Sequence, residues 1–162
     1  LSIILERAGK PYTEAQKEEM AARKNRYYVD LISALTPEDI LPGALEVINA
    51  LKAKGIRVAI GSSSRNTPII LRQIGLSNAF DAVSDGNQIT HSKPHPEVFL
   101  LAAKLLQLPP AECLVVEDAD AGIEAALAGG MKALGVGSAA KNPRATYRAE
   151  TLADADLTEI LR

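Results

Sequence analysis

The sequence predicts an α/β fold in which a parallel sheet is flanked by helices and preceded by a helical region. From Gly43 onward, short apolar runs alternate with helical patterns, which is typical of parallel βαβ units. Before Thr36 the patterns are helical and no segment is typical of a strand. We therefore divide the chain into a helical region at 1–40 and an α/β region at 41–162.

The individual elements follow from hydrophobic periodicity and from turn residues. The helical region has a predicted helix at 1–8 and a long second helix, whose start is marked by Thr13 and Gln16 as a capping box. Strands are predicted at 57–61, 82–84, 114–117 and 133–136. Helices are predicted at 44–54, 68–74, 96–106, 121–127 and 157–161.

The composition is that of a folded domain and excludes several classes of protein. The 162 residues are 47% hydrophobic and 23% charged, unlike a disordered or fibrous chain. A net charge of -2 gives no general attraction to nucleic acid, and no apolar run approaches the length of a membrane span. A single cysteine, Cys113, cannot form an internal disulfide and sits in an apolar run typical of a buried structural thiol. We expect a cytoplasmic monomer.

Ligands of parallel sheets bind beyond the carboxyl ends of the strands, so the residues after each apolar run are the first candidates for a site. The first strand leads into a loop rich in hydroxyl groups: Ser62, Ser63, Ser64, Arg65, Asn66 and Thr67. Its hydroxyls and Arg65 suit phosphate oxygens, and Thr67 with Pro68 suits the N-cap and first turn of the next helix. The alternative is an ordinary serine-rich turn that caps the helix.

Acidic residues follow the strand at 114–117. Glu117, Asp118 and Asp120 gather carboxylates there without neighbouring cysteine or histidine, a donor set that suits Mg²⁺. The alternative is that these acids only complement the dipole of the helix predicted at 121–127.

A third candidate is the loop that contains Lys93. Two prolines prevent a helix from starting before Pro96 and so hold Lys93 on a stiff loop. Its ammonium group could neutralise the carboxylates and a phosphate; the alternative is a solvated surface lysine. His91 and His95 have no partner at a metal-ligand spacing, and we assign them no role.

Lys24 lies on the apolar side of the long helix in the first region. It shares one stripe with Met20, Tyr27, Tyr28 and Leu31. Either its ammonium group extends to water past these side chains, or it points towards a ligand held against the α/β region.

Taken together, these motifs resemble the haloacid-dehalogenase-like (HAD) phosphotransferases. The similarity lies in the segment from Val58 to Ser62, in Ser92-Lys93-Pro94, and in Val115-Val116-Glu117-Asp118. Within that superfamily, Arg23-Lys24-Asn25, Leu41-Pro42-Gly43 and the serine loop are most similar to the β-phosphoglucomutase family.

The resemblance implies a Rossmann-like core with a partial helical cap, and Mg²⁺ as the cofactor. It implies interconversion of β-glucose 1-phosphate and glucose 6-phosphate through an aspartyl phosphate and a bisphosphate intermediate. Ser62 and Lys93 would hold the transferring phosphoryl group, and Glu117 and Asp118 the metal. The residues implied to bind the sugar phosphate are Lys24, Ser64, Arg65 and Asn66. Arg65 is often lysine in that family, which keeps the charge but changes the hydrogen-bond geometry.

One departure from the family is large. No Asp-x-Asp followed by a glycine turn occurs before Gly43, so the nucleophile and its neighbouring acid are absent from these residues. The opening strand of the family lies in the middle of the sheet, and we expect its absence to leave an internal gap. Residues 1–5 are similar to the interior of a cap helix. We therefore expect the 162 residues alone to be inactive and an amino-terminal segment to lie outside them.

Two other functions stay open from the sequence. A phosphatase of the same superfamily would use water in place of a sugar hydroxyl, and the core motifs do not separate the two reactions. A non-catalytic phosphosugar-binding protein would keep the pocket without the nucleophile.

Overall fold

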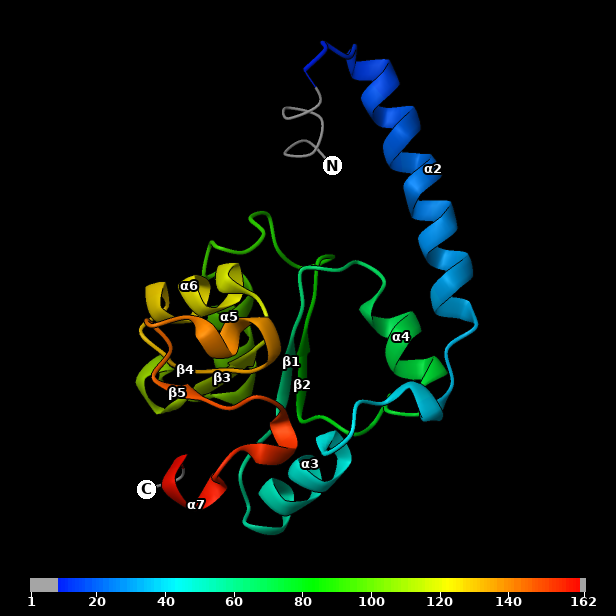
Figure 1. Cartoon of the computed structure of the whole chain (residues 1–162). Coiled ribbons are helices and arrows are strands. Elements are labelled where there is room, and N and C mark those ends of the chain that lie inside the picture. The colour runs from blue at the N-terminus through cyan, green and yellow to red at the C-terminus, as the bar shows by residue number, and fades with distance from the viewer. Residues whose placement is uncertain (1–8, 161–162) are drawn as a thin grey trace.

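The structure alternates helices and parallel strands after a long first helix, as the sequence predicts (Figure 1). The computed structural model describes residues 9–160. The predicted helix at 1–8 and residue 161 of the predicted last helix lie outside the described residues.

The helices are α2 (Glu14–Ser33), α3 (Ala44–Ala53), α4 (Thr67–Gln73), α5 (Glu97–Leu106), α6 (Asp120–Ala128) and α7 (Leu157–Ile160). The strands are β1 (Ala59–Gly61), β2 (Ala82–Ser84), β3 (Leu114–Glu117), β4 (Lys132–Gly135) and β5 (Tyr147–Arg148). Short 3-10 helices occur at η1 (Pro37–Asp39), η2 (Pro110–Glu112), η3 (Gly137–Lys141) and η4 (Leu152–Asp154).

The start of β1 and the presence of β5 differ from the prediction. β1 starts at Ala59 and not at Arg57, because the N–H of Val58 donates to the Asp81 side chain, 2.8 Å away, and not to a strand carbonyl. The Arg57 side chain donates to the carbonyl of Leu106. β5 was not predicted, since two residues are too few to show a periodic pattern.

The strands form two parallel sheets separated by a break (Figure 1). β1 pairs with β2, while β4 lies between β3 and β5. Among the described residues no strand lies between β1 and β3, and Val116 in the middle of β3 is 44% exposed. The break agrees with the internal gap expected from the sequence, which lacks the opening strand of the family.

The core lies where two helices cover the sheets. α5 packs on β1 and β2 and also contacts α6, which packs on β3 and β4. The most buried large side chains are Val98 of α5, Ile123 of α6 and Leu134 of β4. Their apolar burial holds the two sheets in one layered unit and fixes the strand ends that precede the candidate site.

Helix α2 stands apart from the layers (Figure 1). Its capping box is present as predicted: Thr13 Oγ accepts from the N–H of Gln16 at 3.2 Å, and Gln16 Oε1 accepts from the N–H of Thr13 at 2.9 Å. Ile32 is the buried residue of this helix, and its carboxyl end contacts α4. No helix among residues 9–160 is long and apolar enough to cross a membrane.

Candidate active site

The loops that follow β1, β2 and β3 carry most of the polar residues that the sequence singles out. Ser62 follows β1, Asp85 follows β2, and Glu117 is the last residue of β3. The N–H of Ser62 donates to the carbonyl of Ser84 at 3.0 Å, which continues the pairing of β1 and β2 into the loop. The carboxyl ends of the strands therefore position the site, as expected for a parallel sheet.

The serine loop is folded on its own hydroxyl groups. Ser62 Oγ accepts from the N–H of Ser64 at 3.2 Å, and Ser64 Oγ accepts from the N–H of Asn66 at 3.1 Å. Neither hydroxyl donates a hydrogen bond to a described residue, so both can donate to an anion.

The predicted role of Thr67 as helix cap is wrong. Thr67 is the first residue of α4, its hydroxyl donates to the carbonyl of Ser64 at 2.9 Å, and Asn66 occupies the N-cap position without a side-chain capping bond.

A buried turn after β2 supports the serine loop, and the sequence analysis missed it. Asp85 is 5% exposed and its carboxylate accepts from the N–H of Asn87 at 2.8 Å. The N–H of Gly86 donates to the carbonyl of Ser64 at 3.1 Å, and a Cβ at this position would lie 2.9 Å from the nitrogen of Arg65. Only glycine allows so close an approach of the two loops. The available signal was the position of Asp85 directly after an apolar run.

Lys93 extends from its loop to the end of β3. Its ammonium group forms an ion pair with the carboxylate of Glu117, and the two side chains are 19% and 8% exposed. The same ammonium group lies 4.6 Å from the centre of the Phe99 ring, and the N–H of Lys93 donates to Ser63 Oγ at 3.4 Å. The alternative of a solvated surface lysine is therefore wrong.

The first turn of α6 accommodates the Glu117 side chain. A Cβ on Gly122 would overlap the Glu117 carboxyl carbon, so the absence of a side chain at 122 leaves room for the carboxylate. Asp118 is exposed, and its backbone carbonyl accepts from the Ser138 hydroxyl. The Asp120 carboxylate accepts from the Asn142 amide at 2.8 Å.

Glu117 and Asp118 are adjacent oxygen donors at a strand end, one buried and one exposed. Such a pair fits Mg²⁺, which takes one or two carboxylates and keeps several water ligands. The ammonium group of Lys93 is already beside Glu117, so a bound ion would share this carboxylate with it.

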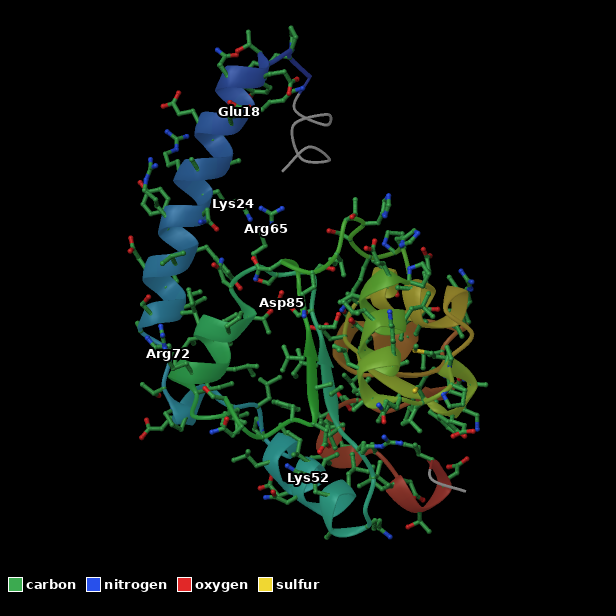
Figure 2. All side chains as sticks on the ribbon, turned by 180° about the vertical axis from the view of Figure 1, so that it is seen from behind. Glu18, Lys24, Lys52, Arg65, Arg72 and Asp85 are labelled. Atoms are coloured by element: carbon green, nitrogen blue, oxygen red, sulfur yellow. The ribbon has the colours of Figure 1, made fainter. Side chains whose placement is uncertain are left out.

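Lys24 and Arg65 face the same space from two elements. Figure 2 shows the Lys24 side chain directed from α2 towards the loop that carries Arg65. The amide of Asn66 donates to the Asn25 side chain at 3.4 Å, which links α2 to the serine loop.

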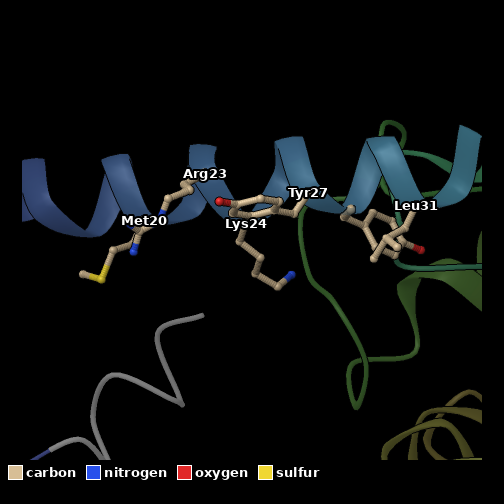
Figure 3. Close-up of a pocket in the computed structure, with 6 residues that line it drawn as sticks. Met20, Arg23, Lys24, Tyr27 and Leu31 are labelled. Carbon is tan, nitrogen blue, oxygen red and sulfur yellow. The ribbon is translucent and has the colours of Figure 1, made fainter.

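The apolar stripe of α2 contains Lys24, as predicted. Figure 3 shows a shallow pocket along this helix that is lined by Met20, Arg23, Lys24, Tyr27, Tyr28 and Leu31. Tyr27 and Leu31 are 66% and 71% exposed in the described part of the chain. Within residues 9–160, Lys24 therefore lies on an exposed apolar face of α2.

His91 and His95 do have a partner, which the sequence analysis missed. Both histidines lie beside Glu97, the first residue of α5. Backbone hydrogen bonds from Thr90 and then from His91 lower the pKa of Glu97 to about 2, although burial acts in the opposite direction. The spacing of His91, His95 and Glu97 in the sequence was the available signal.

Comparison with known proteins agrees with these motifs. Residues 3–130 match the family model described as haloacid dehalogenase-like hydrolase. The chain is 48% identical over 126 residues to β-phosphoglucomutase of Bacillus subtilis, covering 78% of this chain and 56% of the relative. It is 28% identical to a phosphorylated carbohydrates phosphatase of Thermotoga maritima over an alignment of 184 positions, gaps included. That alignment covers 98% of this chain and 85% of the relative.

The fold agrees with a solved relative as well. The crystal structure of β-phosphoglucomutase from Clostridium difficile superposes with a TM-score of 0.85 at 35% identity, over 93% of this chain and 67% of that chain. The match to the Bacillus subtilis relative covers 56% of the length of that protein, so this chain spans little more than half of it. The resemblance seen in the motifs is confirmed, and this chain belongs to the haloacid dehalogenase-like hydrolase family.

Proposed function

We propose that this chain is part of a cytoplasmic, monomeric phosphomutase that interconverts β-glucose 1-phosphate and glucose 6-phosphate with Mg²⁺. The observation that carries the proposal is the placement of Lys24 and Arg65 on facing elements, linked by the hydrogen bond between Asn25 and Asn66. Two cations on opposite sides of one space suit a second phosphate group of a bisphosphate. Similarity to β-phosphoglucomutase of Bacillus subtilis supports the same activity.

Each residue has a role in this proposal. The Ser62 hydroxyl and the Lys93 ammonium group bind the oxygens of the transferring phosphoryl group. Glu117 and Asp118 hold Mg²⁺, which when bound neutralises charge on those oxygens. The four residues Lys24, Ser64, Arg65 and Asn66 bind the second phosphate and orient the sugar.

The nucleophile of this proposal is an aspartate outside the 162 residues, because no Asp-x-Asp followed by a glycine turn occurs before Gly43, where the family's first motif would stand. In the proposed reaction that aspartate takes the phosphoryl group, which a sugar hydroxyl then accepts. We expect residues 1–162 without such a segment to bind sugar phosphate but not to transfer a phosphoryl group.

The test compares isomerisation with hydrolysis in a chain that includes an aspartate-bearing first strand. Lys24→Ala is expected to lower kcat/KM for isomerisation about 10- to 100-fold, the effect of losing one charge-assisted hydrogen bond. Release of phosphate from a small ester that does not reach α2 is expected to stay unchanged.

Lys17→Ala is the matched control. It removes the same charge from the same helix, at a position where Lys17 pairs with Glu14 at 2.7 Å. Equal isomerisation rates in the Lys24→Ala variant and the control would contradict the proposed role of Lys24.

A sugar-phosphate phosphatase is the second candidate. It is favoured by the relative from Thermotoga maritima, whose name is that of a phosphatase and whose alignment covers 98% of this chain. Stoichiometric release of inorganic phosphate from glucose 1-phosphate, without formation of glucose 6-phosphate, would establish this function in place of the mutase.

A further inference from the structure

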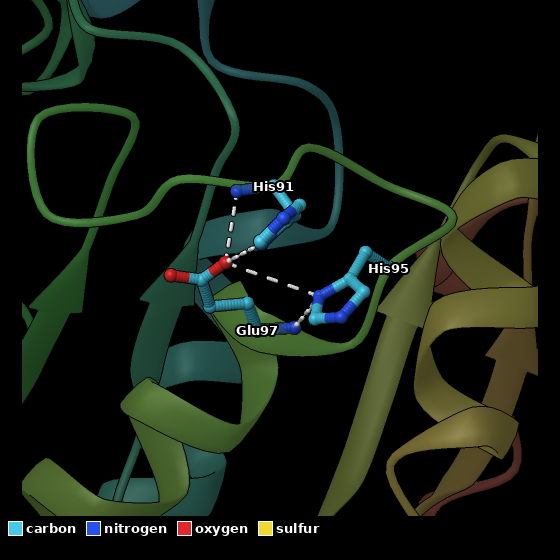
Figure 4. Close-up of side chains that lie close together, drawn as sticks. All are labelled: His91, His95 and Glu97. Atoms are coloured by element: carbon cyan, nitrogen blue, oxygen red, sulfur yellow. Dashed lines mark hydrogen bonds and ion pairs between the residues drawn. The ribbon is translucent and has the colours of Figure 1, made fainter.

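A cluster of two histidines and one glutamate lies on the surface of the loop that carries Lys93 (Figure 4). The side chains of His91 and His95 are 62% and 51% exposed, and that of Glu97 is 29% exposed. One ligand atom from each residue lies within 4.8 Å of the other two. Solvent therefore reaches three groups that all belong to common types of metal ligand.

The position of the carboxylate is fixed by the backbone. Glu97 Oε1 accepts from the N–H of Thr90 at 2.9 Å, and Oε2 accepts from the N–H of His91 at 2.8 Å. These two hydrogen bonds connect the start of α5 to the loop segment before Lys93. The carboxylate is thus held in place before any ion arrives, which reduces the ordering that binding would require.

The two imidazole rings are oriented by the same glutamate. His91 Nδ1 lies 2.9 Å from Glu97 Oε2, and His95 Nδ1 lies 3.9 Å from the same oxygen. The N–H of Glu97 donates to His95 Nδ1 at 3.3 Å, so this nitrogen carries a lone pair that becomes available to an ion when this long hydrogen bond opens. The two nitrogen–oxygen distances lie on either side of the roughly 3.3 Å between neighbouring ligands of a tetrahedral ion with bonds of about 2.0–2.2 Å.

We propose that His91, His95 and Glu97 form a binding site for a divalent transition-metal ion of the Zn²⁺ class. Two imidazoles and one carboxylate are a donor set of zinc sites, and a water molecule would complete the tetrahedron. Imidazole favours such ions over Mg²⁺, so this site differs in chemistry from the carboxylates Glu117 and Asp118.

Binding exchanges two hydrogen bonds, the one between His91 Nδ1 and Glu97 Oε2 and the one from the Glu97 N–H to His95 Nδ1, for three metal–ligand bonds. An ionised carboxylate only accepts, so the hydrogen between His91 Nδ1 and Glu97 Oε2 belongs to the ring. On binding, the ring shifts to the tautomer with its proton on Nε2, through exchange with water, and Nδ1 and Oε2 both ligate the ion. No electron is transferred, and a neutral ring loses no net proton.

The inference does not rest on the proposed function. The ligands lie on both sides of Lys93 in the sequence, so an ion would tie together the two ends of its loop. The Lys93 side chain itself points to Glu117 and is not a ligand.

The test uses the ring carbon-bound hydrogens of histidine in the NMR spectrum of the full, untagged chain. The 162 residues contain only two histidines, and the variants His91→Asn and His95→Asn assign their signals. Zn²⁺ is expected to shift both sets of ring signals together, with saturation at one equivalent. Mg²⁺ at the same concentration is expected to shift neither.

Each ligand is then removed in turn. We expect His91→Asn, His95→Asn and Glu97→Gln each to weaken Zn²⁺ binding by at least about tenfold. Two control variants should retain the parent affinity: Cys113→Ser, which removes the single thiol, and Asp118→Asn, which removes an exposed carboxylate at the end of β3 and leaves the ion pair of Lys93 with Glu117 in place.

Three results would overturn the inference. They are a shift of one histidine alone, an unchanged affinity in the Glu97→Gln variant with its amide spectrum intact, and loss of the histidine shifts in the Asp118→Asn variant. His91 and His95 are exposed, so we expect their Asn variants to fold normally. Loss of Zn²⁺ binding in these variants would therefore reflect the loss of a ligand.

Discussion

Lys93, in the loop before α5, forms an ion pair with Glu117, the last residue of β3, which lies 24 residues further along the sequence. Both side chains are largely shielded from water, and the Phe99 ring covers one side of the ammonium group. The pair joins the segment before α5 to the end of β3, on either side of the break between the sheets.

Removing both members of this pair should cost less stability than the sum of the two single removals. Lys93→Met leaves the Glu117 carboxylate buried without its partner, and we expect a loss of stability on the order of 3 kcal/mol. The double variant Lys93→Met with Glu117→Gln should lose less than the sum of the single changes. Urea unfolding of the four proteins measures this coupling, and strictly additive losses would contradict the buried pair.

Gly122→Ala should destabilise the protein although alanine is the better helix former. Propensity alone would favour alanine by about 1 kcal/mol in the helix. A Cβ at 122 would overlap the Glu117 carboxyl group, which must then leave Lys93. Thermal unfolding of the variant is expected to occur at a lower temperature than that of the parent.

The control for Gly122→Ala is the same change in a Glu117→Ala background. Without the Glu117 carboxyl group the new methyl group has room, and we expect a neutral or stabilising effect. Gly129→Ala tests whether the effect is specific to Gly122. A Cβ at 129 would lie 3.3 Å from the Cβ of Pro96, so it would not overlap its neighbour as a Cβ at 122 would. A stabilising effect of Gly122→Ala in the parent would show that Glu117 lies elsewhere.

Glu97 should make stability fall in acid. Its pKa is lowered from 4.5 to about 2 in the folded chain, first by the N–H of Thr90 and then by that of His91. The folded state therefore favours the ionised form, and the resulting stabilisation is complete above pH 4.5 and is lost as the pH falls towards 2. In metal-free buffer, the melting temperature of Glu97→Gln should fall less than that of the parent over this range. If the melting temperatures of the parent and of Glu97→Gln fell equally over this pH range, the lowered pKa of Glu97 would be contradicted.

Cys113 should react slowly with thiolate-selective reagents. Burial raises the pKa of its thiol above 9.0, and the neighbouring Glu112 charge adds to this effect. At pH 8 we expect alkylation slower than that of a free cysteine, with the ordinary rate restored in urea. Equal rates in the presence and absence of urea would show that Cys113 is not shielded by the fold.

Local patterns in the sequence were sufficient for much of the fold. The parallel alternation, the capping box at Thr13 and the strand at 114–117 depend on neighbours within a few residues, so periodicity reveals them. β5 could not be predicted in this way, because its two residues become a strand only by pairing with β4.

The residue types at the strand ends could be identified without a structure, since hydroxyl, ammonium and carboxylate groups follow the apolar runs. Their partners depend on how the elements pack in three dimensions. Glu117 meets Lys93 because α5 and α6 pack together, and the space for its carboxylate depends on Gly122. Glu97 meets His91 and His95 because a bent loop returns to the start of α5. Contacts of this kind depend on how the chain packs, which hydrophobic periodicity does not describe.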